Sequence, residues 1–128
     1  MSLTDVPRAE WASALEAFGR EHRAWLTTVE HLASDGTRDT WMSDRPLAGV
    51  FAERERTGIA VRIELAPDSS PGASSLRIED PIAVRLDRER DGPVSALEIE
   101  DGEGGRTRVR FRVTPPAEML DGVAPGEL

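Results

Sequence analysis

Alternation of apolar and polar residues constrains the fold of this chain more than any other feature of its sequence. In "IAVRIEL", residues 59–65, every odd-numbered residue is a large apolar one, which is the period of a β-strand with one buried face. The stretch "RTRVRFRV", residues 106–113, alternates in the same way and carries arginine at every even position. We therefore expect antiparallel strands that bury one face and expose the other.

The parity of the apolar positions predicts how two of these strands pair. Residues 82–86 carry their large apolar side chains at even positions, whereas residues 97–99 carry them at odd positions. Facing residues share a face of the sheet, so the two numbers of each pair must have an odd sum. A two-residue turn at Asp91-Gly92 meets this condition. The predicted pairs are Arg90 with Pro93, Leu86 with Leu97, Val84 with Ile99, and Arg85 with Glu98.

The next hairpin needs a loop of odd length, because residues 109–113 keep the parity of residues 97–99. A three-residue Gly-Glu-Gly loop and a five-residue loop within "DGEGGR" both satisfy this requirement. The shorter loop places Glu98 opposite Arg108 and Glu100 opposite Arg106, and the longer loop places Glu98 opposite Arg110 and Glu100 opposite Arg108. With either loop, glutamates lie between the arginines of both neighbouring strands.

The arginine row of residues 106–112 is therefore predicted to belong to an Arg–Glu–Arg ladder on the solvent side of the sheet. Each exposed pair of this kind contributes about 0.2–1 kcal/mol. A strip that binds nucleic acid would lack the facing glutamates. The chain has 16 basic and 24 acidic side chains, a formal charge of −8, which repels polyanions. We expect no nucleic-acid partner.

The N-terminal segment predicts the one helix, over about residues 6–19. Trp11, Leu15 and Phe18 form a single apolar stripe at helical spacing, and Gly19 marks either its end or a frayed turn, with extension to His22 as the alternative. Strands are expected at about residues 23–32, 38–43, 46–54 and 59–66, followed by the two hairpins. Residues 76–86 keep one parity through Asp80-Pro81, which predicts a single long strand with a bend at that point and Asp80 on its apolar side.

These elements predict an α+β fold, in which an N-terminal helix packs on, or plugs, a strongly curved antiparallel sheet or small barrel of about six to eight strands. Residues 1–113 are expected to form one domain, and residues 114–128 a Pro/Gly-rich tail. Residues 1–3 have the character of a cloning remnant.

Missing residue types exclude several kinds of chemistry. The chain has no cysteine, lysine or tyrosine, and all 16 basic residues are arginine. This excludes thiolate zinc sites, iron–sulfur clusters, cysteine nucleophiles and Schiff-base or P-loop lysines. We expect no metal and no cofactor. With neither a signal peptide nor an apolar run long enough to cross a membrane, we expect a soluble cytoplasmic protein without a membrane partner.

Three residues are weak candidates for a binding site. His31 is predicted to face inward at a barrel mouth, Trp41 has a polar context suited to an exposed aromatic platform, and Asp80 is a potential buried general base. Each also has a purely structural interpretation: a satisfied polar residue, a tryptophan over a sheet edge, and an Asx-type bond at the bend. His22 is expected to interact with the helix dipole, and its spacing from His31 is not that of metal ligands.

Several stretches resemble a bacterial family of unknown function, family 5335. They are "VPRAEWASALEAFGREHRAWLTTVE", "PLAGV", "IEDPIAVRL" and "ALEIEDGEGGRTRVRFR", and the resemblance spans residues 6–113. It implies a free-standing bacterial domain and assigns neither an activity nor site residues. The cyclic-dinucleotide-binding PilZ barrels have a similar size, but their RxxxR and D/NxSxxG motifs are not met, since only two residues separate Arg20 from Arg23.

We therefore expect a non-enzymatic binding or accessory domain, whose partner is another protein, a second copy of the chain in a homodimer, or a small ligand. The alternative is a small-barrel enzyme or ligand-binding protein. In that case the barrel mouth would collect His31, Asp80 and either Trp41 or Trp25.

The tail contains a small apolar group. Pro115-Pro116 cannot extend a central strand, and Met119, Leu120 and Val123 cluster after it. Such a short helical turn is not stable alone in water, so the tail either docks across an open sheet edge or stays disordered and available to a partner. We expect docking, because the apolar residues are grouped.

Truncation at Thr114 tests this expectation. If the tail docks, its removal should lower the melting temperature by several degrees, the effect of losing ~1–2 kcal/mol from a domain of this size. Differential scanning calorimetry of the full and truncated chains measures the difference. Equal melting temperatures would contradict docking and would make Met119 and Leu120 candidates for contact with a partner.

Overall fold

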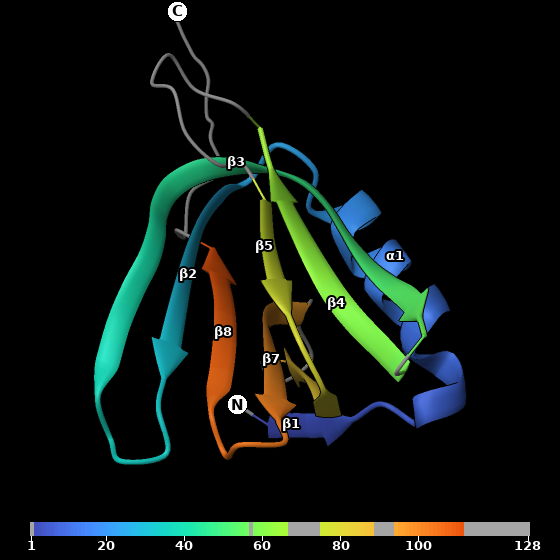
Figure 1. Ribbon diagram of the computed structural model, residues 1–128. Helices are drawn as coiled ribbons and strands as arrows, with labels where there is room; N and C mark the ends of the chain where they lie inside the picture. Colours follow the sequence, from blue (N-terminus) through green and yellow to red (C-terminus); the bar gives the residue numbers. More distant parts are fainter. Residues whose placement is uncertain (1, 57, 67–74, 89–93, 112–128) are drawn as a thin grey trace, which may run out of the picture.

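The computed structural model describes residues 2–56, 58–66, 75–88 and 94–111 (Figure 1). This part of the chain contains one α-helix, one short 3₁₀ helix and eight strands. In chain order they are β1 (Ser2–Asp5), η1 (Arg8–Glu10), α1 (Trp11–Glu21), β2 (Leu26–Leu32), β3 (Arg38–Glu55), β4 (Gly58–Leu65), β5 (Ser75–Ile78), β6 (Pro81–Arg88), β7 (Val94–Asp101) and β8 (Arg106–Phe111).

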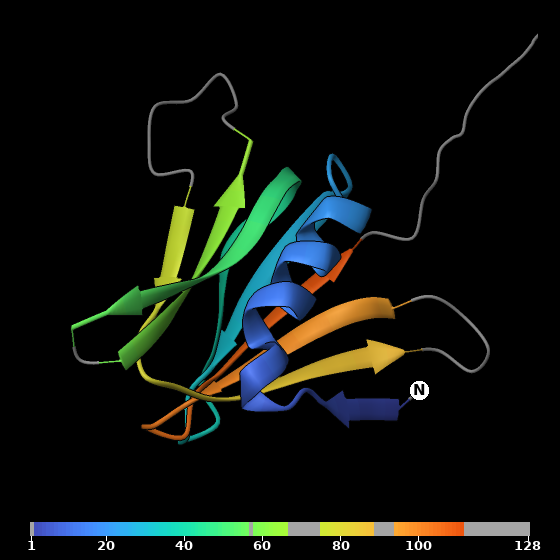
Figure 2. The same ribbon diagram turned by 90° about the vertical axis from the view of Figure 1, so that its right-hand side faces the viewer.

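The strands form one antiparallel sheet in the order β1-β6-β7-β8-β2-β3-β4-β5. Only Glu79 and Asp80 join β5, at one edge, to β6, next to the other edge, so the sheet must curl strongly at that end. Figure 2 shows its two halves meeting at this connection and diverging away from it. The predicted N-terminal helix and curved antiparallel sheet are confirmed. Closure into a barrel is wrong, because β1 and β5 remain separate edges.

β3 joins the two halves of the sheet. Its first part pairs with β2 and its last part pairs with β4. The pairing shifts between Thr27 and Val29 on β2, and again between Leu47 and Gly49 on β3; such bulges bend a strand and increase its twist. The two strands predicted for residues 38–43 and 46–54 are thus one bent strand. Its alternation is lost at the bulges, which is why the sequence suggested a break.

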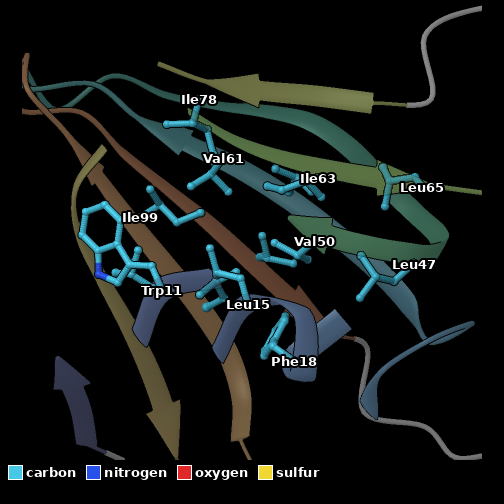
Figure 3. Close-up of a cluster of buried hydrophobic side chains, with 14 residues drawn as sticks. Trp11, Leu15, Phe18, Leu47, Val50, Val61, Ile63, Leu65, Ile78 and Ile99 are labelled. Carbon is cyan, nitrogen blue, oxygen red and sulfur yellow. The ribbon is translucent and has the colours of Figure 1, made fainter. Parts of the chain in front are cut away.

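The core lies between α1 and the inner face of the curled sheet (Figure 3). The predicted helical stripe of Trp11, Leu15 and Phe18 is buried there, at 0–3% exposure. The odd-numbered apolar residues of β4 face it from the other side. The buried cluster comprises Trp11, Leu15, Phe18, Val29, Leu47, Val50, Val61, Ile63, Leu65, Ile78, Val84, Leu97, Ile99 and Val109.

Gly19 lets α1 cross β3 at very short range. A Cβ atom at this position would lie 2.6 Å from the backbone nitrogen of Val50 and 3.1 Å from the Cα of Gly49. The residue therefore belongs to the helix–sheet contact and not to the helix end, and the predicted alternative of an extension towards His22 is the correct one. The helix continues to Glu21 and is capped by His22.

His22 ties the end of α1 to β7. Its Nδ1 lies 2.8 Å from the carbonyl oxygen of Phe18, in the last helical turn, and its Nε2 lies 3.0 Å from that of Val94. The contact with the helix C-terminus agrees with the predicted role at the negative end of the dipole.

Both hairpin registers follow the parity argument over most of their length. In the β6–β7 pair Leu86 faces Leu97, Val84 faces Ile99 and Arg85 faces Glu98, as predicted. The pairing then shifts by one residue between Asp87 and Arg88, so that Arg88 faces Val94 and not Ser95, the partner that the predicted register gives it. Asp91-Gly92 and the pair of Arg90 with Pro93 lie outside the described residues. In the β7–β8 pair Glu98 faces Arg108 and Glu100 faces Arg106. The loop is therefore the three-residue Gly-Glu-Gly alternative.

The predicted ion-pair ladder forms on the outer face, and it is more buried than expected. Glu98 lies between Arg85 Nη1, at 3.3 Å, and Arg108 Nε, at 3.7 Å. Arg108 also approaches Asp87 at 3.4 Å. Glu98 is only 6% exposed and Asp87 only 3%. The ladder thus lines a recess of the sheet instead of a fully wetted surface.

Two predictions for residues 76–86 are wrong. The segment is two strands with different partners, because β5 pairs with β4 and β6 pairs with β1 and β7. A pairing shift between Pro81 and Ala83 turns Ile82 outward to 52% exposure. Asp80, at φ 52°, lies in the left-handed region and is exposed instead of facing the apolar side.

The first residues of the chain also differ from expectation. Ser2–Asp5 form β1, which pairs along β6 with Leu3 opposite Asp87. Residues 2 and 3 thus belong to the sheet. The predicted C-terminal tail lies outside the described residues. Among the helices that the structure describes, none is long and apolar enough to cross a membrane.

Gly19→Ala tests the close packing of α1 on β3. Alanine normally favours a helix by about 1 kcal/mol over glycine, but here the added methyl group meets backbone atoms of β3 that cannot move aside alone. We expect the free energy of unfolding to fall by about 1–3 kcal/mol, measured by urea denaturation. Glu21→Ala, at an exposed position of the same helix, should change it little. A more stable Gly19→Ala variant would refute the packing argument.

Candidate functional site

The rings of His31 and Trp41 stack on each other at one end of the sheet. Their centroids are 4.6 Å apart and their planes differ by 7°. His31 comes from the end of β2, and Trp41 from the start of β3, which is an interior strand of the sheet. The part of β3 that carries Trp41 pairs only with β2, because β4 pairs with β3 from Leu47 onward, so Trp41 lies at a locally open edge of the sheet, as its structural interpretation expected. It is 40% exposed, as an aromatic platform requires.

Asp101 approaches this stack from the loop between β7 and β8. Its Oδ1 accepts hydrogen bonds from the backbone N–H groups of Glu103, at 2.9 Å, and Gly105, at 3.0 Å. This local turn fixes the carboxylate and leaves Oδ2 at 3.9 Å from His31 Nε2. The short Gly-Glu-Gly loop thus positions a carboxylate beside the imidazole.

Asp80 lies against the same loop. Its backbone carbonyl accepts a hydrogen bond of 3.0 Å from the N–H of Gly102, which joins the β5–β6 connection to the β7–β8 loop. A Cβ atom on Gly102 would overlap the Asp80 carboxylate as it lies here, so the Asp80 side chain packs directly over the backbone of the loop. Asp80 is exposed, and therefore it is not the buried general base that the sequence suggested.

These groups surround a cavity of about 290 Å³, here named the acidic cavity. It is bounded by the start of β3, by β5 and the β5–β6 connection, by the end of β7 with the β7–β8 loop, and by the start of β8. The β7–β8 loop and the β5–β6 connection lie at the lower end of the molecule in Figures 1 and 2. Its lining residues are Trp41, Arg77, Ile78, Glu79, Asp80, Asp101, Gly102, Glu103 and Thr107.

The structure therefore brings together the three candidate residues of the sequence analysis. Trp41 and Asp80 line the acidic cavity, and His31 supports Trp41 from behind. Trp25 does not join them. It lies beyond the opposite end of β2, in edge contact with His22 at 4.8 Å and Phe111 at 5.3 Å.

Thr107 is a member of the site that the sequence analysis missed. It lines the acidic cavity at 1% exposure, and its Oγ1 is buried without a hydrogen-bond partner among the described residues. Thr107 pairs with His31 across β2 and β8. The sequence contains one signal for it: among the odd-numbered, inward positions of "RTRVRF", Thr107 is the only polar residue.

The cavity carries an excess of negative charge. Arg77 is the only basic side chain among the described residues that line it. Arg77 is already neutralised by Glu79 at 2.7 Å, by Glu53 at 3.3 Å and by Glu55. The carboxylates of Asp80, Asp101 and Glu103 remain. Nowhere in the described residues do three acidic or imidazole groups meet closely enough to hold a metal ion.

Comparison with known proteins found no matching family model, no matching curated protein and no matching solved structure. The resemblance to family 5335 therefore stays a prediction. The candidate site rests on the geometry of this chain alone.

A pair of threonine variants tests whether the Thr107 hydroxyl is unsatisfied. Thr107→Val removes a buried group without a partner, so we expect the free energy of unfolding to rise by about 1 kcal/mol. Thr27 is equally buried on the neighbouring strand, but its Oγ1 donates to the Trp25 carbonyl at 2.8 Å. Thr27→Val should therefore lower the free energy of unfolding by about 1 kcal/mol. Similar losses in both variants, measured by urea denaturation, would show that Thr107 has a partner.

Proposed function

We propose that this protein is a non-enzymatic binding domain that holds a small organic cation in the acidic cavity. The observation that carries the proposal is the convergence of Trp41, Asp80 and Asp101 on one cavity, with the Thr107 side chain in its lining.

Trp41 and the carboxylates favour a cation as the ligand. Tryptophan is the best aromatic platform for a cation, at about 0.5–1 kcal/mol when exposed and about 2 kcal/mol or more when desolvated. The His31 ring holds the Trp41 ring in place, so little side-chain entropy is lost on binding. Asp101 is fixed by two backbone hydrogen bonds and supplies the opposite charge at the same cavity.

The position of His31 supports binding over acid–base catalysis. A general base must lie within hydrogen-bond reach of the proton that it removes or of the group that orients it. His31 Nε2 is 3.9 Å from Asp101 Oδ2, and within the described residues it makes no hydrogen bond. Its ring is instead committed to the stack with Trp41.

Calorimetric titration with choline and with arginine amide tests the proposal. Choline carries one quaternary ammonium group, and arginine amide carries a guanidinium group and an α-amino group; both are small organic cations of a size that suits a cavity of about 290 Å³. We expect one of them to bind, and we expect Trp41→Leu and Asp101→Asn each to weaken its binding about tenfold, as the loss of roughly 1.4 kcal/mol implies. Trp25→Leu is the matched control, because Trp25 is 45% exposed and Trp41 is 40% exposed.

The control decides the interpretation. Unchanged binding in Trp25→Leu, together with weaker binding in Trp41→Leu, supports the acidic cavity as the site. Equal weakening in both tryptophan variants, or no binding of either probe, contradicts it. Mass spectrometry of small molecules released from the purified protein gives an independent measurement: a co-purifying cation should be present in the Trp25→Leu sample and depleted in the Trp41→Leu sample.

A further inference from the structure

A second cavity lies on the outer face of the sheet, on the other side of β8 and β2 from the acidic cavity. Its volume is about 350 Å³, and we name it the arginine cavity. Residues from β1 and from the start of β3 both line it, because the sheet is curved between these strands. Its lining residues are Leu3, Glu30, Leu32, Arg38, Glu98, Arg106, Arg108 and Arg110.

The lining of the arginine cavity has a net positive charge in an acidic protein. Four arginines face two glutamates there, whereas the whole chain has a formal charge of −8. Both glutamates are already neutralised. Glu30 pairs with Arg110 at 2.9 Å, and Glu98 lies between Arg85 and Arg108.

Arg38 and Arg106 are the two arginines of this cavity that take no part in the ion pairs of the ladder. Neither forms an ion pair with any described residue. Glu100 faces Arg106 across β7 and β8, but its carboxylate turns to the other side and binds Arg85 Nη1 at 3.0 Å. The ladder therefore fixes the floor of the cavity and leaves two guanidinium groups without a counter-charge.

The register brings these two arginines to the same place. Leu32 on β2 pairs with Arg38 on β3 and with Arg106 on β8. The three residues thus form one row on one face, in which the two arginine backbones stand about 10 Å apart, twice the strand spacing. Arginine side chains are long enough for both guanidinium groups to reach an anion above Leu32.

We propose that the arginine cavity binds a small anion with a phosphate or carboxylate group, held between Arg38 and Arg106. Guanidinium groups match the oxygens of such anions with two parallel hydrogen bonds. A polyanion such as nucleic acid is disfavoured by the negative charge of the rest of the protein. Half-buried Leu32 offers an apolar contact for the carbon skeleton of the ligand. This site is independent of the acidic cavity, whose residues lie on the opposite face.

Calorimetric titration at low salt, with inorganic phosphate and separately with succinate, tests the proposal. We expect at least one of these anions to bind. Arg38→Gln and Arg106→Gln should each weaken its binding about tenfold or more, and the double variant should abolish it. Arg54→Gln is the matched control: Arg54 is an exposed residue at the other end of β3, it makes no ion pair with the described residues, and it lies outside the cavity.

The outcomes separate the two anion sources. Binding of phosphate alone supports a phosphorylated ligand, and binding of succinate alone supports a carboxylic acid. No binding of either anion, or equal weakening in Arg54→Gln, overturns the proposal. Since Arg38 and Arg106 take part in no ion pair of the described ladder, their glutamine variants should keep the melting temperature of the parent protein, which shows that any loss of binding is local.

Discussion

The burial of Glu98 is the constraint on which both faces of the sheet depend. A buried carboxylate costs several kcal/mol unless charged partners surround it. Arg85 from β6 and Arg108 from β8 supply these partners. Only one register places both arginines beside Glu98, and a slip by one residue would turn Glu98 into the core and Leu97 out of it. The ion pairs on one face and the apolar rows on the other are thus fixed by the same pairing.

This fixed register places two cavities of opposite character back to back. Neighbouring residues of a strand point to opposite faces, so Arg106 lines the arginine cavity while Thr107 lines the acidic one. On β2, Leu32 shares the face of Arg106 and His31 shares the face of Thr107. The end of the sheet near the β7–β8 loop is therefore where both proposed ligands are held, whereas the rest of the sheet and α1 supply the core.

The sequence predicted the parts of the fold that regular alternation determines and missed the parts that interrupt it. The apolar rows, the helical stripe and the pairing of Val84 with Ile99 follow from parity. Ile82 was misplaced because a bulge reverses its direction, and β3 was divided for the same reason. The meeting of His31, Trp41 and Asp80 depends on the curl of the whole sheet, which no local pattern specifies. Each could be identified alone as a candidate, whereas their proximity was expected only under the small-barrel alternative, in which the choice between Trp41 and Trp25 stayed open.

Arg106 shows where a register stops predicting side-chain partners. Glu100 stands opposite Arg106, as parity required, yet it binds Arg85. Arg85 also donates hydrogen bonds to Asp5 at 2.8 Å and to Glu98 at 3.3 Å. Its hydrogen bond to Glu100 makes the largest contribution to raising the pKa of its guanidinium. Asp5 belongs to β1, the strand that the sequence did not reveal. Backbone pairing decides which residues are neighbours, but the ion pairs depend on every charge within reach. That Arg106 has no ion-pair partner among the described residues is therefore a property of the assembled face, and it is the reason why one arginine of a row that the sequence predicts as a structural ladder is proposed to bind a ligand.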